Sequence, residues 1–94
     1  MLDIQVEDHG IVRLAGRLDA SESDRALKVL KTIETSLTLD CSQLDYISSA
    51  GIGVFVETYK RLHASGHGFK LVHLMPRVRN IFAYSGLDRI LTIE

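Results

Sequence analysis

Cysteine, surplus basic charge and long apolar runs are scarce or missing in this sequence. A single cysteine, Cys41, excludes an intrachain disulfide framework. The net charge of −1 leaves no basic surplus to neutralise phosphates, which argues against direct nucleic-acid binding. No apolar run approaches the roughly 20 residues of a membrane-spanning helix, and residues 1–4 lack the basic and apolar blocks of a secretion signal. These absences predict a cytoplasmic protein that binds neither nucleic acid nor membrane.

The composition is that of an ordinary globular protein. Hydrophobic residues make up 46% and charged residues 24% of the 94 positions, so the chain can bury one modest core. No linker, repeat or low-complexity segment interrupts it, and residues 1–94 are predicted to form one domain. Cys41 has no cationic neighbour in sequence and is predicted to be a small buried apolar residue.

Hydrophobic periodicity predicts strands that alternate with helices. The chain opens with a hairpin, because apolar residues alternate over 2–6 and recur over 11–14 on either side of a turn signal at 8–10. Strands follow at 37–39, 69–74 and 90–93, and helices begin near Ser21, Ser49 and Pro76. We therefore predict an α/β fold with a mixed, mostly parallel sheet, an N-terminal β-hairpin and about three helices.

The predicted helices have recognisable ends and faces. Ser21 with Asp24 resembles a capping box, with aspartate in place of the preferred glutamate. On the second helix Glu57, Lys60 and Arg61 are expected to face water, because the apolar residues recur on another face.

Two adjacent serines stand where a strand is predicted to run into the second helix. The segments 16–21 and 40–51 both follow strands, and functional groups of such sheets gather at the carboxyl ends of strands. The hydroxyl groups of Ser48 and Ser49 are expected to lie beside the free N–H groups at the N-terminus of this helix, where a negative charge is tolerated. Such a serine is a cap, an anion site, a nucleophile or a phosphorylation switch. Because a cap needs one serine, the pair leaves one hydroxyl free.

Two glycines follow these serines in the first turn of the helix. Each costs about 1 kcal/mol relative to alanine, so Gly51 and Gly53 suggest that something approaches the backbone closely there. That neighbour is either another molecule or, for Gly53, the sheet beneath the helix.

Catalysis has weak support in the sequence. Ile47 stands where a G-x-S-x-G elbow has its first glycine, so Ser48 and Ser49 lack the motif of a hydrolase nucleophile. Among the four histidines only His73, in a strand, could face the serines, and the residues before it give no sign that it does. We expect no catalytic residue.

Nucleotide and metal binding are no better supported. Neither glycine-rich phosphate-binding motif is present. Asp19, Asp40 and Asp45 could gather around a cation, but carboxylates at strand ends are common. We expect no cofactor and no metal.

Four segments together resemble a known family. They are GRLD at 16–19, LDCS at 39–42, ISSAGIGV at 47–54 and SGL at 85–87. In this order and at this spacing they resemble the STAS domain of the bacterial anti-sigma factor antagonist, or anti-anti-sigma factor, type. The resemblance covers essentially the whole chain.

The resemblance implies a binding switch. In this family the unphosphorylated antagonist binds an anti-sigma factor that is also a serine kinase, and so releases the sigma factor for transcription. The kinase then phosphorylates a serine at the start of the second helix, and a PP2C-type phosphatase resets the switch. The family serine aligns with Ser49. Ser48 stands where well-known members carry aspartate and is the alternative acceptor.

The resemblance also implies a contact surface. Asp19 aligns with an acidic residue of the family, and a phosphate near Asp19 and Asp45 is expected to deepen a negative patch. The predicted partner-binding residues are Asp19, Ser21, Ser48, Gly51, Gly53 and Glu57. The alternative is a constitutive STAS scaffold or accessory subunit, of the phospholipid-transport ATPase or stressosome type, without phosphate turnover.

Overall fold

One sheet of five strands organises the computed structural model, which describes all residues from 1 to 94. The strands are β1 (Leu2–Glu7), β2 (Ile11–Leu18), β3 (Leu37–Ile47), β4 (Phe69–Val72) and β5 (Thr92–Ile93). They lie in this order across the sheet. β1 and β2 pair antiparallel as the predicted hairpin, and all other neighbours pair parallel. The predicted mixed, mostly parallel sheet is therefore confirmed.

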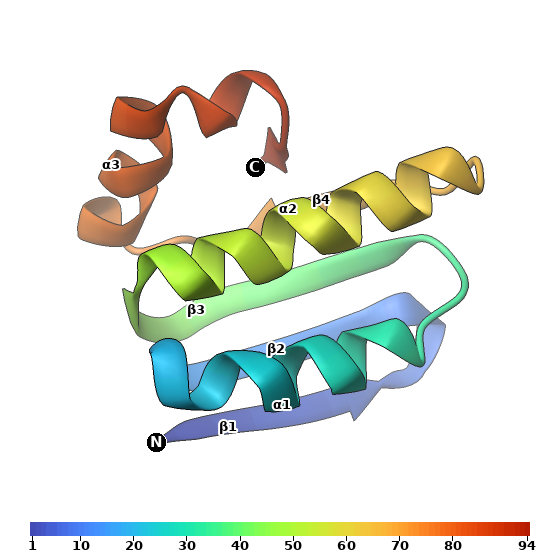
Figure 1. Cartoon of the computed structure of the whole chain (residues 1–94), viewed down its shortest axis with the longest axis horizontal. Helices are drawn as coiled ribbons and strands as arrows, with labels where there is room; N and C mark the ends of the chain where they lie inside the picture. Colours follow the sequence, from blue (N-terminus) through green and yellow to red (C-terminus); the bar gives the residue numbers. More distant parts are fainter.

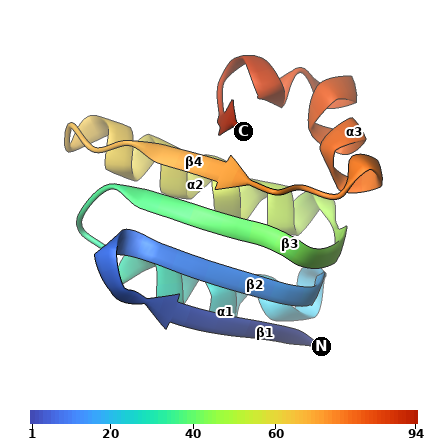
Figure 2. The same cartoon turned by 180° about the vertical axis from the view of Figure 1, so that it is seen from behind.

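Two of the three helices cover the same face of this sheet. α1 (Ala20–Lys31) and α2 (Ser49–Ala64) lie side by side in front of the sheet in Figure 1, and the sheet lies in front of both in Figure 2. α3 (Pro76–Ser85) follows the end of β4 and lies beyond α2. None of the helices combines the length and the apolar character that crossing a membrane requires.

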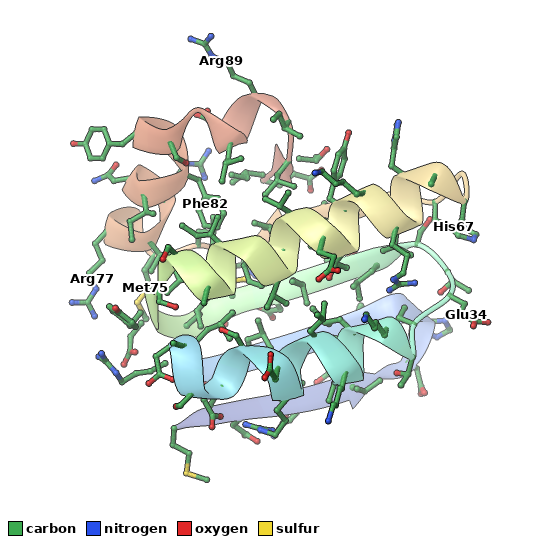
Figure 3. The ribbon with its side chains drawn as sticks, in the orientation of Figure 1. Glu34, His67, Met75, Arg77, Phe82 and Arg89 are labelled. Atoms are coloured by element: carbon green, nitrogen blue, oxygen red, sulfur yellow. The ribbon has the colours of Figure 1, made fainter.

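The core lies between the sheet and its helices. Alternate side chains of β2 and β3 are buried beneath α1 and α2, because successive residues of a strand face opposite sides. Phe55 of α2 stacks on Phe82 of α3, with ring centroids 6.1 Å apart, and meets the ring of Phe69 of β4 edge-on at 6.4 Å. Figure 3 shows Phe82 on the side of α3 nearest α2. Cys41 is buried as predicted, and burial raises the pKa of its thiol to about 12.

β3 is much longer than the sequence predicts. Its pairing with β4 stops at Asp40, but its pairing with β2 continues to Ile47. Register shifts interrupt this second half, and Ser42 and Gln43 are both exposed, so the alternation of apolar residues is lost. The predicted end of this strand near residue 40 is therefore wrong, and Ser48 alone connects β3 to α2, which begins at Ser49 as predicted.

The last two strands are shorter than predicted. β4 ends at Val72, where His73 adopts a left-handed backbone with φ 62°. β5 holds only Thr92–Ile93, because a short helical turn occupies Leu87–Arg89. Pro76 begins α3 and Gly86 ends it, both as predicted.

Close packing at Gly51 positions α2 on the sheet. A Cβ atom there would lie 2.8 Å from both the Cγ atom and the carbonyl oxygen of Leu18, and 2.9 Å from the Cγ1 atom of Ile47. A Cβ atom at Gly53 would have no neighbour within 4 Å, and Gly53 is exposed. The close approach therefore occurs at Gly51, and the suggestion that Gly53 packs on the sheet is wrong.

We expect Gly51→Ala to lower the free energy of unfolding by about 1–3 kcal/mol, because the new methyl group would overlap Leu18 and Ile47. Gly53→Ala, on the same helix, should raise it by about 0.5–1 kcal/mol, because alanine restricts the unfolded chain and meets nothing in the fold. Urea denaturation of both variants measures the difference. Equal effects would contradict this account of the packing.

Arg61 joins α2 to the end of α1. Its Nη1 donates to the carbonyl oxygen of Ile33 at 3.0 Å, and its Nη2 donates to that of Leu30 at 2.8 Å. The prediction that Arg61 faces water is therefore wrong, whereas Glu57 and Lys60 are exposed as predicted. The last carbonyl groups of a helix lack partners within that helix, and Arg61 supplies donors to those at the end of α1. The hydrophobic periodicity of α2 does not reveal this contact, because the acceptors belong to another helix.

Arg61→Ala is expected to lower the free energy of unfolding by about 1.5–3 kcal/mol, because hydrogen bonds from a charged donor are lost. Lys60→Ala removes the same charge from the exposed neighbouring position and should change it by less than about 0.5 kcal/mol. Thermal and urea unfolding check both values. A similarly small effect in the two variants would mean that the hydrogen bonds from Arg61 to Leu30 and Ile33 contribute little to the free energy of unfolding.

Candidate functional site

The two serines at the start of α2 have different roles. Ser48 is the N-cap, and its hydroxyl oxygen accepts a hydrogen bond from the backbone N–H of Gly51 at 3.2 Å. Its own N–H donates to the carbonyl oxygen of Leu18 at 3.0 Å and so joins the end of β3 to the end of β2. Ser49 is the first residue of α2, and its exposed hydroxyl forms no hydrogen bond within the chain. One hydroxyl caps the helix and the other is free, as predicted from the presence of two adjacent serines.

Ser49 lies on the outer surface of α2. With roughly 100° between successive residues of a helix, Ser49 is close to Val56 around the helix and opposite the buried Thr58. Arg61 marks the side of α2 that faces α1, and Ser49 is turned away from it by about a third of a turn. Phe55, which stacks on Phe82 of α3, lies a third of a turn from Ser49 in the other direction. The free hydroxyl therefore points outward, midway between the α1 and α3 sides of α2.

Asp19 caps α1 as Ser48 caps α2. Its carboxylate accepts hydrogen bonds from the hydroxyl of Ser21 at 2.7 Å and from the backbone N–H of Ser21 at 3.1 Å. These hydrogen bonds, the one from the hydroxyl foremost, lower the pKa of the Asp19 carboxyl, so it is charged at neutral pH. α1 begins at Ala20, and the predicted capping box of Ser21 and Asp24 is wrong because Asp19 supplies the cap.

The two caps lie at one edge of the sheet. They follow β2 and β3, which are neighbouring parallel strands, and the hydrogen bond from Ser48 to Leu18 links them directly. Gly51 does not belong to the accessible surface, because it is buried against the sheet. The other predicted contact residues lie at this edge or along exposed α2, with at least part of their surface accessible: Asp19, Ser21, Ser48, Gly53 and Glu57.

A hollow of about 230 Å³ opens beside the same edge. Its charged and aromatic lining consists of Arg17 of β2, Asp45 and Tyr46 of β3, and Arg77 of α3. The Arg17 guanidinium lies over the ring of Tyr46, 4.1 Å from its centroid. The hollow is lined by two arginines and one aspartate, so its net charge is positive. This differs from the negative patch expected near Asp45. Sequence reasoning missed the arginines, because only the fold brings α3 to the end of β3.

No histidine accompanies the serines. The Nδ1 atom of His73 lies 3.3 Å from Oδ1 of Asp40, and Asp40 is about 26 Å along the chain from Ser48, at the start of α2. Ser49 therefore has no histidine to serve as a general base. The structure also does not gather Asp19, Asp40 and Asp45, and no group of three or more potential metal ligands occurs in the chain.

Known proteins share both sequence and fold with this chain. The family model described as "Mlab, STAS domain" matches residues 3–92. An anti-sigma F factor antagonist of Paenibacillus polymyxa is 30% identical over 100 residues, which cover 98% of this chain and 86% of the relative. An anti-sigma-B factor antagonist of Listeria monocytogenes is 29% identical over 91 residues, which cover 93% and 80%. The solved structure of the Bacillus cell fate determinant SpoIIAA in the phosphorylated form superposes with a TM-score of 0.74 at 19% identity, over 100% of this chain and 91% of that one.

The family motifs coincide with the site. Residues 16–19 and 47–54, on which the resemblance partly rests, meet at the edge that carries both helix caps. The family model extends over nearly the whole chain, and the fold agrees with that of the solved relative. The chain therefore belongs to the STAS domain family.

Proposed function

We propose that this protein is an anti-sigma factor antagonist whose binding is switched off by phosphorylation of Ser49. Its partner is an anti-sigma factor that is also a serine kinase, and a PP2C-type phosphatase restores the binding form. The observation that carries the proposal is the division between the serines: Ser48 is held as a cap, and Ser49 presents a free hydroxyl. The relatives from Paenibacillus polymyxa and Listeria monocytogenes, which are anti-sigma factor antagonists, support the same class.

Ser49 is a better phosphate acceptor than Ser48. The Ser48 oxygen is half-buried and accepts the N–H of Gly51, so a phosphate there would disturb a cap that contributes about 0.5–2 kcal/mol. The Ser49 oxygen is exposed and has no partner to lose. Phosphorylation at Ser49 therefore leaves the cap and the fold intact.

The switch acts through charge and volume. The γ-phosphoryl group of ATP passes to the Ser49 oxygen, and ADP and the hydroxyl proton leave. The phosphate carries about −1.5 to −2 charges at pH 7, which the N-terminus of α2 tolerates. Against a docked partner the same group occupies space and adds to the charge of Asp19, and like charges across an interface cost several kcal/mol. Since about 5.5 kcal/mol turns a 99:1 equilibrium into 1:99, one phosphate has the required magnitude.

Incubation with ATP, magnesium and the anti-sigma-type serine kinases of its own host should add one phosphate, which mass spectrometry should locate on Ser49. Ser49→Ala should accept none and should stay bound to the kinase when ATP is added. Ser48→Asp is the matched control, because aspartate also caps helices well, and it should still be phosphorylated on Ser49.

Other outcomes would change the proposal in defined ways. A phosphate on Ser48 would keep the switch and move its acceptor by one residue. No phosphate with any such kinase, together with equal partner binding by the wild type and Ser49→Ala, would contradict the switch. It would favour a constitutive scaffold or accessory subunit instead.

A further inference from the structure

The hollow lies on the face of the sheet that α1 and α2 leave uncovered. Arg17 and Tyr46, which line it, each precede a residue that packs beneath the start of α2, so their side chains face the other way. α3 supplies the rest of the lining, beginning with Arg77 in its first turn. Figure 3 shows Arg77 at the end of the molecule where β3 ends. The hollow is therefore separate from the surface of α2 that carries Ser49.

Asp45 lines this hollow with a carboxylate that lacks a donor. It is the extra residue of a β-bulge, because consecutive residues of β2 pair with Leu44 and Tyr46 and skip it. Its Oδ1 atom is buried and accepts no hydrogen bond, and a buried acceptor without a partner destabilises a protein. Rotation about the last bond of an aspartate side chain is broad and roughly two-fold, so either oxygen can turn toward a donor in the hollow. The carboxylate therefore favours an occupant that donates a hydrogen bond.

The charges around the hollow favour a neutral donor. Arg17 and Arg77 are exposed, and neither forms an ion pair with Asp45 or with any other acidic group. Arg17 instead lies over the ring of Tyr46, 4.1 Å from its centroid. The two guanidinium groups repel a lysine or arginine of a partner, and the carboxylate of Asp45 repels an acidic group or a phosphate. A donor without net charge meets neither obstacle.

The rest of the lining is apolar and calls for more than a small hydroxyl group. It consists of the ring of Tyr46 and of Ile47, Val78 and Ile81. The hollow of about 230 Å³ has room for a whole side chain, since one water takes about 30 Å³ in the liquid. A tyrosine suits both parts of the lining, because its ring is apolar and its far end is an O–H donor. The guanidinium groups beside the hollow can also lie over the face of such a ring.

The residues around the hollow are those that protein interfaces favour. Two of the three tyrosines of the chain lie there, Tyr46 at the hollow and Tyr84 further along α3. Tyr84 is 88% exposed and follows Arg77 by seven residues, which places both on one side of α3. Arginine and tyrosine are enriched where proteins bind one another, and a pocket that takes one side chain commonly anchors such an interface. An exposed tyrosine beyond the hollow favours a protein over a small molecule.

We infer that a protein partner docks on this surface by inserting one tyrosine side chain into the hollow, where its hydroxyl donates to Asp45. Arg17 and Arg77 flank the inserted ring, and Tyr84 extends the contact along α3. This surface is on the other side of the sheet from Ser49, so the inference goes beyond the phosphorylation switch and does not depend on it. A partner bound here leaves the surface of α2 free for another protein.

The first measurement titrates the ¹⁵N-labelled whole chain with 4-methylphenol, which is the side chain of tyrosine as a free molecule. We expect a dissociation constant on the order of 1 mM, with NMR shifts at the amides of Asp45, Tyr46 and Ile81. Toluene has the same ring without the donor. At equal concentration below saturation it should cause shifts about ten times smaller, because a hydrogen bond to a charged acceptor is worth at least about ten-fold in affinity.

Asp45→Ala should weaken the binding of 4-methylphenol by about ten-fold for the same reason. Asp88→Ala is the matched control, because it removes the same charge from an exposed position that does not line the hollow, and it should leave the binding unchanged. Circular dichroism of both variants checks that the fold is retained.

Selection from a displayed peptide library on the whole chain tests for a protein partner. The selected peptides should share a tyrosine, and 4-methylphenol should compete with them. Phenylalanine in place of that tyrosine removes only the hydroxyl and should weaken a peptide by about ten-fold on the wild type, but hardly at all on Asp45→Ala.

Three results would overturn the inference. The first is no binding of 4-methylphenol at the hollow, or equal shifts with toluene. The second is equal binding by Asp45→Ala and Asp88→Ala, which would mean that the carboxylate takes no part. The third is a set of selected peptides without tyrosine, which would leave the hollow as a site for a small phenol rather than for a protein. None of these results involves phosphorylation of Ser49, so they are independent of the proposed function.

Discussion

The close approach of α2 to the sheet at Gly51 determines where the groups of the candidate site lie. With no side chain there, the first turn of α2 rests directly on Leu18 and Ile47. This contact brings Ser48 close enough to donate its N–H to Leu18 while its hydroxyl caps the helix. Ser49 then faces outward. A larger residue at position 51 would lift the helix and disturb all of these positions together.

Charged groups of both signs gather where β2 and β3 end. Asp19 is the charged cap of α1, and Arg17 and Arg77 line the hollow together with Asp45. They come from three elements, β2, β3 and α3, and from the residue that joins β2 to α1. The ends of neighbouring parallel strands therefore bring together side chains that are far apart in the sequence.

Much of the fold could be predicted because it depends on local patterns. Alternating apolar residues revealed the opening hairpin, and Pro76 and Gly86 marked the ends of α3. The length of β3 could not be predicted, because register shifts remove the alternation on which such predictions rely. The partners of Arg61 were equally hidden, since they lie on another helix.

The sequence by itself determined the order and type of the elements, the family, and the fact that two serines begin α2 with only one needed as a cap. Only the tertiary structure decided that Ser48 is the cap, that Gly51 rather than Gly53 packs on the sheet, and that Arg17, Asp45 and Arg77 line one hollow. Caps and periodic faces arise from neighbours in the chain and leave a readable pattern. Contacts among β2, β3 and α3 arise from residues far apart in the chain, and no local pattern records them.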